Sequence, residues 1–136
     1  MCLEKLSRHQ AWGLVALRVA VGVVFLYHGF LKWPLNPDMP WYLTLAAFVE
    51  PAAGLLLLGG LVTRYAALAL SAVMLGAIWM KMTGFGNAPL DPLGTFAPQG
   101  ATGWEFDLVL LAACIALVFL GGGAYALDRW CLKGRA

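Results

Sequence analysis

The chain has 136 residues, of which 62% are hydrophobic and only 12% charged, and its formal net charge is +2. A soluble domain is usually about a quarter charged and under half apolar. The composition therefore excludes an ordinary soluble globular protein and indicates an integral membrane protein. The few positive charges form no basic stripe, so we expect no nucleic-acid partner. The length fits a single transmembrane domain over 1–136.

Four apolar runs have lengths suited to crossing a bilayer, for which about 20 residues are needed. They cover about 11–31, 41–62, 65–81 and 104–121, and the last two are short. No period-two alternation typical of membrane β-strands is present, and backbone groups in lipid must pair within their own segment. The sequence therefore predicts an all-α fold, an integral membrane four-helix bundle running up-down-up-down, with an outer loop over 82–103.

Lysine and arginine residues outside the spans are divided unequally between the two sides of the predicted bundle. One side holds both termini and the 62–65 turn, and it carries Lys5, Arg8, Arg64, Arg129, Lys133 and Arg135; the other side carries only Lys32 and Lys81. Positive residues accumulate on the cytoplasmic side of membrane proteins. We therefore expect a multi-pass protein of the inner membrane, surrounded by lipid, with both termini in the cytoplasm.

Ionisable side chains inside the predicted spans are the first candidates for a functional site. Each costs at least about 2.5–3.5 kcal/mol to insert and usually faces a bundle interior. Arg18 and Glu50 are clear cases, and His28 lies nearer a helix end. At 1.5 Å per residue, Glu50 lies between Arg18 and His28 in depth. We expect Glu50 to face inward beside Arg18, although Arg18 can instead extend to the headgroups and the pair can be purely structural.

The surroundings of Glu50 favour a polar pocket. Pro51 supplies no backbone N–H, which leaves the carbonyl of Ala47 without its helical donor and favours a kink. Small residues, Ala47 and Gly54 among them, lie three or four positions away on the same face. Such residues let another helix or a flat ligand approach closely. Arg18 has a similar face with Gly22 and Phe25.

A second polar cluster is expected at the outer ends of the helices. Lys32 closes the first span and Lys81 the third, while Glu105 and Asp107 open the fourth. Acidic residues in a first turn are favoured by the helix dipole, and this explanation is the simpler one for Asp107, so Glu105 is the preferred site candidate. The glycine- and proline-rich segment 81–104 is expected to fold over the outer mouth as a lid. The three cysteines form no CxxC pair, and no metal site is predicted.

In chain order these landmarks resemble the DoxX family of small four-helix membrane proteins. The resemblance is carried by "LRVAVGVVFLYHGFLKW" at 17–33, "VEPAAGLLLLGGLVTRYAALAL" at 49–70, "MLGAIWM" at 74–80 and "GWEFDLVLLAACIALVFLGGGAYALDRW" at 103–130. It covers nearly the whole chain. The family positions that this resemblance carries over are Arg18, His28, Gly29, Lys32, Glu50, Gly54, Thr63, Arg64 and Glu105. The proline after Glu50 and the long glycine- and proline-rich loop depart from the family pattern.

The resemblance implies a redox setting, with a quinone as the possible ligand and a soluble or membrane oxidoreductase as partner. The chain itself has only two histidines, and His9 lies outside the spans, so a bis-histidine haem within one chain is excluded, whereas His28 with Met80 is conceivable. Two alternatives stay open: a non-catalytic anchor or assembly subunit, and a small proton or solute pathway. The glycine pairs and triplets also permit a homo-oligomer. The candidate residues are, for catalysis, Glu50, Arg18 and His28, and, for ligand binding, Gly22, Phe25, Lys32, Ala47, Gly54, Lys81 and Glu105.

Overall fold

The computed structural model describes residues 9–33, 35, 37–85 and 103–129. It contains the long helices α2 (Gln10–Leu31), α3 (Trp41–Gly59), α4 (Thr63–Thr83) and α5 (Trp104–Leu120), and no strand among these described residues. Each helix end lies within three residues of the predicted end. The all-α prediction is therefore confirmed for the described part of the chain.

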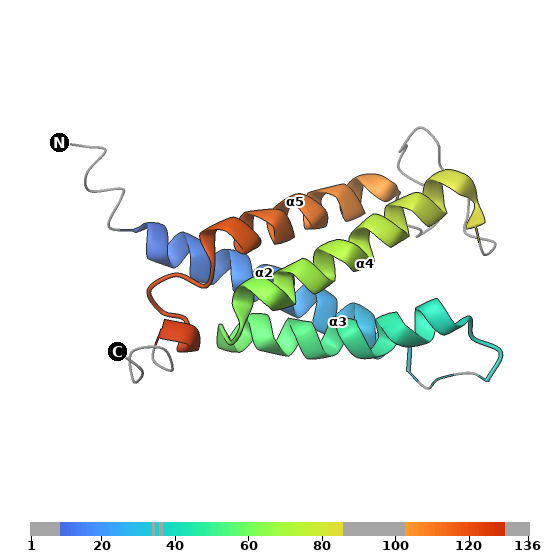
Figure 1. The fold of residues 1–136 in the computed structure, drawn as a ribbon, viewed down its shortest axis with the longest axis horizontal. Coiled ribbons are helices and arrows are strands. Elements are labelled where there is room, and N and C mark those ends of the chain that lie inside the picture. Colours follow the sequence, from blue (N-terminus) through green and yellow to red (C-terminus); the bar gives the residue numbers. More distant parts are fainter. Residues whose placement is uncertain (1–8, 34, 36, 86–102, 130–136) are drawn as a thin grey trace.

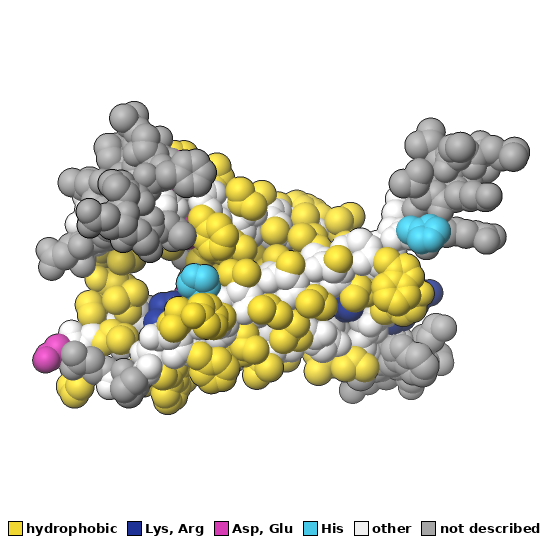
Figure 2. Space-filling model, turned by 180° about the vertical axis from the view of Figure 1, so that it is seen from behind, with side chains coloured by type: hydrophobic (Ala, Val, Ile, Leu, Met, Phe, Trp, Pro, Cys, Tyr) yellow, Lys and Arg dark blue, Asp and Glu magenta, His cyan; other side chains and the backbone are white. Residues whose placement is uncertain are grey.

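Three of the helices, α2, α3 and α4, are long and apolar enough to cross a membrane. The fourth, α5, has 17 residues, which at 1.5 Å per residue gives about 25 Å. Large apolar side chains such as Leu68, Leu75 and Phe119 are exposed around the outside, and Figure 2 shows the hydrophobic side chains spread along the length of the molecule. A surface of this kind is suited to lipid.

The four helices are arranged as two antiparallel pairs, α2 with α3 and α4 with α5, and the pairs meet at one end and spread apart at the other (Figure 1). We call the spread end, where α2 and α4 finish and α3 and α5 start, the open end. The opposite end, with the 60–62 turn and residues 121–129, is the turn end. The core between the helices is built from aliphatic side chains such as Val21, Leu57 and Leu70 with Phe25.

Glycines set the close approach of α2 to α3. A Cβ at Gly22 would lie 2.9 Å from the carbonyl oxygen of Gly54, and one at Gly54 would lie 2.8 Å from the carbonyl oxygen of Gly22. A Cβ at Gly29 would lie 2.3 Å from Cδ of Pro51. Small residues permit this kind of backbone contact between membrane helices. The α2–α3 pair is therefore held at a short distance along much of its length.

The turn end is closed by residues from the far end of the chain. Gly60 ends α3 with a left-handed φ of 66°, and the carboxylate of Asp128 accepts hydrogen bonds from the backbone N–H groups of Val62 at 2.5 Å and Thr63 at 3.0 Å. These two groups would otherwise lack partners at the start of α4. The helix dipole also favours a carboxylate in this position. Segment 121–129 thus fixes the turn between the two helix pairs.

Candidate functional site: a pocket with two ion pairs

A pocket of about 660 Å³ lies between the two helix pairs at the open end. All four helices contribute to its walls, which are mostly aliphatic and aromatic, and Figure 2 shows a hollow at this end with a histidine and a basic side chain on its rim. Its volume falls in the range of about 300–1,000 Å³ typical of small-molecule sites. The charged residues that line it are Lys32, Glu50, Lys81 and Asp107.

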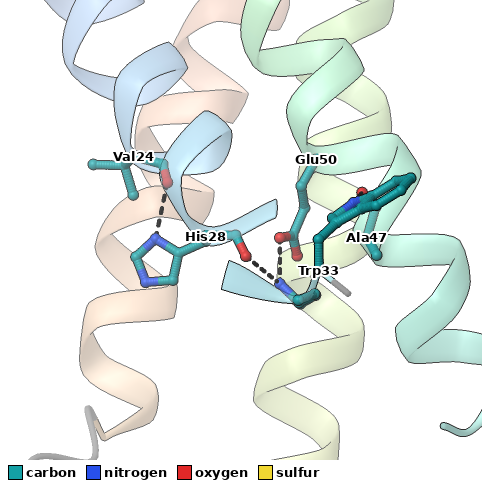
Figure 3. A network of polar contacts seen from close by, with 6 residues as sticks. Val24, His28, Trp33, Ala47 and Glu50 are labelled. Atoms are coloured by element: carbon teal, nitrogen blue, oxygen red, sulfur yellow. Dashed lines mark hydrogen bonds and ion pairs between the residues drawn. The ribbon is translucent and has the colours of Figure 1, made fainter. Parts of the chain in front are cut away.

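Lys32 and Glu50 form an ion pair that joins α2 to α3. The carboxylate side chain is 5% exposed and the lysine side chain 24% exposed. Lys32 Nζ also donates to the backbone carbonyl of His28 at 3.2 Å, and Figure 3 shows the Glu50 side chain directed at this ammonium group. A buried carboxylate needs such a partner, because an unpaired charge in an apolar site is costly.

Lys81 and Asp107 form the matching ion pair on the other side, between α4 and α5, with Nζ and Oδ2 2.6 Å apart. The Asp107 side chain is 9% exposed and that of Lys81 22% exposed. Each helix pair therefore brings one nearly buried carboxylate and one partly accessible ammonium group to the same pocket. Both pairs are electrically neutral as units, which lowers the cost of placing them among apolar walls.

Pro51 is accommodated inside α3 by a side chain from the segment that precedes this helix. The carbonyl of Ala47, which loses its helical donor to the proline, accepts a hydrogen bond from the indole Nε1 of Trp33 at 3.2 Å (Figure 3). Helix α3 continues through Pro51 to Gly59. The predicted freed carbonyl is thus present, and Trp33 is its partner. This contact fixes the start of the 33–40 segment beside Glu50.

His28 lies at the rim of the pocket and points away from Glu50. Its Nδ1 is 2.8 Å from the carbonyl oxygen of Val24, and the side chain is exposed (Figure 3). The centroids of the His28 and Phe106 rings are 6.3 Å apart, and this ring contact joins α2 to α5. His28 therefore contributes to the pocket wall, while its backbone carbonyl, rather than its ring, contacts the Lys32–Glu50 pair.

The prediction that Arg18 lies beside Glu50 is wrong. Arg18 is 3% exposed at the turn end, where Nη2 donates to the carbonyl of Tyr125 at 3.5 Å and Asp128 supplies the opposing charge. Helical side chains lean toward their own N-terminus, so Arg18 leans away from Glu50 and Lys32 leans toward it. Arg18 is also not extended to headgroups, because it is buried under segment 121–129.

Other predicted ligand-binding residues divide between the pocket and the helix packing. Phe25, Lys32 and Lys81 line the pocket. Gly22 and Gly54 form the α2–α3 contact instead, and Ala47 is fully buried. The residues that do not line the pocket are thus Gly22, Ala47, Gly54 and Glu105.

Asp107 is the site residue that the sequence analysis passed over in favour of Glu105. The sequence carried no signal for this choice, because apolar residues follow both acids, but the structure separates them: positions three, four and seven residues after Asp107 are Leu110, Leu111 and Cys114, which are all buried. The corresponding positions after Glu105 start with Leu108 and Val109, which are exposed. Residues at this spacing share a helix face. Asp107 thus belongs to the inward face of α5.

Two further features concern a metal site and the expected lid. Within the described residues no group of three or more His, Cys, Asp and Glu side chains could hold a metal ion. Most of the expected lid, residues 86–102, lies outside the described part of the chain.

The chemistry available in the pocket follows from these contacts. An ammonium group donates hydrogen bonds, and a carboxylate accepts hydrogen bonds and protons. The apolar walls contributed by α3 and α4 form a surrounding of low polarity, in which such contacts are stronger than in water. The arrangement defines an integral membrane protein with an apolar pocket that offers polar groups from each of its two helix pairs.

Comparison with known proteins identifies the family of the chain. A model of the DoxX family matches residues 13–83, and the chain belongs to the DoxX family. An uncharacterised protein of Haemophilus influenzae is 32% identical, with 93% of this chain and 96% of the relative covered. An uncharacterised membrane protein of Mycobacterium tuberculosis is 31% identical, with 85% and 79% covered. A Bacillus subtilis protein named "Putative oxidoreductase CatD" is 28% identical, with 90% of each chain covered. No solved structure matches the chain.

Proposed function

We propose that this chain is the quinone-binding membrane subunit of a redox system and that a partner oxidoreductase supplies the electrons. The observation that carries the proposal is the placement of the two ion pairs, Lys32–Glu50 and Lys81–Asp107, on different helix pairs of one apolar pocket. A quinone is a flat apolar ring with carbonyl oxygens at opposite edges. Its shape and polarity match an apolar pocket with a polar group on either side.

Reduction of a quinone to a quinol adds two electrons and two protons, so each carbonyl oxygen requires a hydrogen-bond donor and a proton source. Lys32 and Lys81 are the donors, because their ammonium groups are the more accessible members of the pairs. Glu50 and Asp107 hold and pass the protons. Phe25 and Phe106 line the pocket and offer apolar contacts to the ring.

The electrons in this proposal come from a partner protein. The named Bacillus subtilis relative supports a redox setting. The partner enzyme, attached to one face of the membrane, would supply the electrons. This chain would hold the quinone that receives them. A non-catalytic anchor would instead use the same ion pairs only to hold its helices together, and the experiment below distinguishes the two.

The proposed topology is an up-down-up-down four-helix bundle in the inner membrane with both termini in the cytoplasm. The six basic residues near the termini and the 62–65 turn, against two at the open end, support this orientation. The pocket then lies in the leaflet opposite the cytoplasm, among lipid-dissolved quinone.

The proposal is tested with Glu50→Gln and with the double variant Lys32→Met/Glu50→Leu in nanodiscs. Decylubiquinone binding is measured by quenching of tryptophan fluorescence, since Trp41 lines the pocket. Glu50→Gln is expected to weaken binding at least about tenfold, because Lys32 loses the carboxylate that holds its ammonium group in place as the donor to the quinone carbonyl, and a hydrogen bond from a charged donor is worth at least that factor. It should also lower stability by about 3 kcal/mol, because it strands the Lys32 ammonium.

The double variant separates function from packing. Replacing a whole buried pair with apolar side chains is often neutral for stability, so the melting temperature should return close to that of the wild type while quinone binding stays weak. Asp38→Asn, a change of the same kind at an exposed position outside the pocket, is the control for quinone binding, which it should leave unchanged. A double variant that binds decylubiquinone as the wild type does would reduce the pair to a structural role and reject the proposal.

A further inference from the structure

The wall of the pocket formed by α4 is open to the surroundings of the protein. Ala69, Ala72 and Gly76 line the pocket and are also exposed. They lie at spacings of three and four residues and so share one face of the helix. Leu45, on the facing helix α3, likewise lines the pocket and is exposed. The space between α3 and α4 is therefore a groove that joins the pocket to the lipid side.

Gly76 lies at an unobstructed point of this groove. A Cβ built on it would meet no atom within 4 Å, in contrast to Gly22 and Gly54, which are in close contact with each other's backbone. Gly76 is five residues from Lys81, or about 8 Å along the helix, and Ala69 is about 18 Å from Lys81. The groove thus begins at the polar groups and continues along small side chains toward the turn end.

We infer that this groove, lined by Leu45, Ala69, Ala72 and Gly76, is the lateral entry and the tail site for a ligand with a polar ring and a long hydrocarbon chain. The inference rests on the proposed function and specifies its substrate class as a tailed, membrane-dissolved quinone. The head lies between the two ion pairs, and the chain extends through the groove past Gly76 into lipid. The ligand therefore reaches the pocket sideways from the bilayer without crossing water.

The occupant follows from the continuity of the groove with the charged end of the pocket. A helix of another protein could also pack on the face of α4 that carries the small side chains. That helix would have to cover the charged Lys81 and Asp107 at the open end of the groove. A hydrocarbon chain attached to a hydrogen-bonding head meets both requirements at once. The small side chains supply room rather than attraction, because lipid and groove are equally apolar to the tail.

The test compares Gly76→Leu with Gly13→Leu. Gly13 is an exposed helical glycine of α2, and a Cβ there also meets nothing within 4 Å, so the control makes the same change outside the pocket. The probes are decylubiquinone, with a ten-carbon chain, and the same quinone ring without the chain. Binding is measured in nanodiscs of fixed phospholipid content, and the thermal melting of each variant is recorded.

Gly76→Leu is expected to weaken decylubiquinone binding about tenfold, the size of an overpacking effect. It should change binding of the chain-free ring by less than about threefold, and Gly13→Leu should change neither. Equal weakening of both probes, unchanged decylubiquinone binding, or a retained phospholipid that decylubiquinone does not displace would overturn the tail site while leaving the quinone proposal standing. Failure of the wild type to bind either probe would instead reject the proposed function, and the tail site with it.

Discussion

At the scale of single residues, the contact between Trp33 and Ala47 explains how α3 carries a proline beside its buried acid. Pro51 removes the donor for the Ala47 carbonyl, and Trp33 Nε1 replaces it at 3.2 Å. The indole ring also packs edge-on against Phe48, with ring centroids 5.2 Å apart. The proline therefore does not leave a buried acceptor unpaired, because a residue from the adjoining segment supplies the hydrogen bond.

This explanation predicts a coupling between two substitutions. Trp33→Phe keeps an aromatic ring but removes the donor, and should lower the free energy of unfolding by about 1–3 kcal/mol because the Ala47 carbonyl is left unpaired. Pro51→Ala restores the backbone N–H, so Trp33→Phe should cost about 1 kcal/mol less in that background. Thermal or denaturant unfolding of the four proteins in detergent measures the difference. Additive effects would show that the indole contributes only packing.

Residue-level prediction from the sequence succeeded for Pro51 and Glu50 and failed for the partner of Glu50. The burial of the acid and the freed Ala47 carbonyl follow from local chemistry, namely insertion cost and the missing N–H. Depth along the helix suggested Arg18, but the direction of the side chains selects Lys32, which leans back from the end of α2 onto the carboxylate. Depth alone could not supply that direction.

At the scale of elements, the short distance between α2 and α3 depends on glycine at the contact. A Cβ at Gly29 would lie 2.3 Å from Pro51 Cδ, and also 2.9 Å from Pro51 Cγ and N. The ring of Pro51 is rigid, so the contact cannot be relieved by a side-chain rotation. Helices α2 and α3 would have to move apart, and the Lys32–Glu50 pair that joins them would be strained.

Gly29→Ala should therefore lower the free energy of unfolding by about 1–3 kcal/mol relative to Gly13→Ala. Both substitutions replace a glycine of α2 by alanine, so they share the same gain in helix propensity, and the difference isolates the packing. Gly13→Ala meets no atom within 4 Å and should leave the protein equally or slightly more stable. Equal melting temperatures for the two variants would contradict the close α2–α3 contact.

The helices themselves were predictable because long apolar runs bounded by glycine, proline and polar residues are a strong signal. The start of α4 at Thr63 instead of 65 depends on Asp128, whose carboxylate holds the N–H groups of Val62 and Thr63. Val62 takes a positive φ of 43°, which is uncommon for a β-branched residue. A contact between residues more than 60 positions apart leaves no mark on the local pattern, so this boundary was beyond sequence reasoning.

At the scale of the whole molecule, the spread of the two helix pairs creates the pocket, and this arrangement could not be predicted. All four helices are apolar on most faces, so their periodicity does not indicate which face meets which neighbour. The sequence grouped Lys32, Lys81 and the acids of the fourth helix at one end correctly. It could not divide them into one pair on each side of a cavity, because that division results from the packing of α2 on α3 and of α4 on α5.

The proposed orientation predicts which side of the membrane each end faces. In a background without the native cysteines, Asp38→Cys marks the open end and Arg129→Cys marks the turn end, and both positions are exposed. A membrane-impermeant maleimide should label Asp38→Cys in whole cells in which the outer membrane is permeabilised and the inner membrane is intact. It should label Arg129→Cys only in inverted membrane vesicles, because the excess of basic residues holds that end in the cytoplasm.

The reversed labelling pattern would place the pocket in the cytoplasmic leaflet and contradict the assignment from basic residues. Labelling of both positions from the same side would be inconsistent with an odd number of crossings between residues 38 and 129, and hence with α5 as a full span. The second result is informative because α5, with 17 residues, is the shortest helix. Its N-terminal turn carries Asp107, the partner of Lys81 on α4, so the depth of α5 also determines whether both ion pairs lie at the level of a quinone ring in the bilayer.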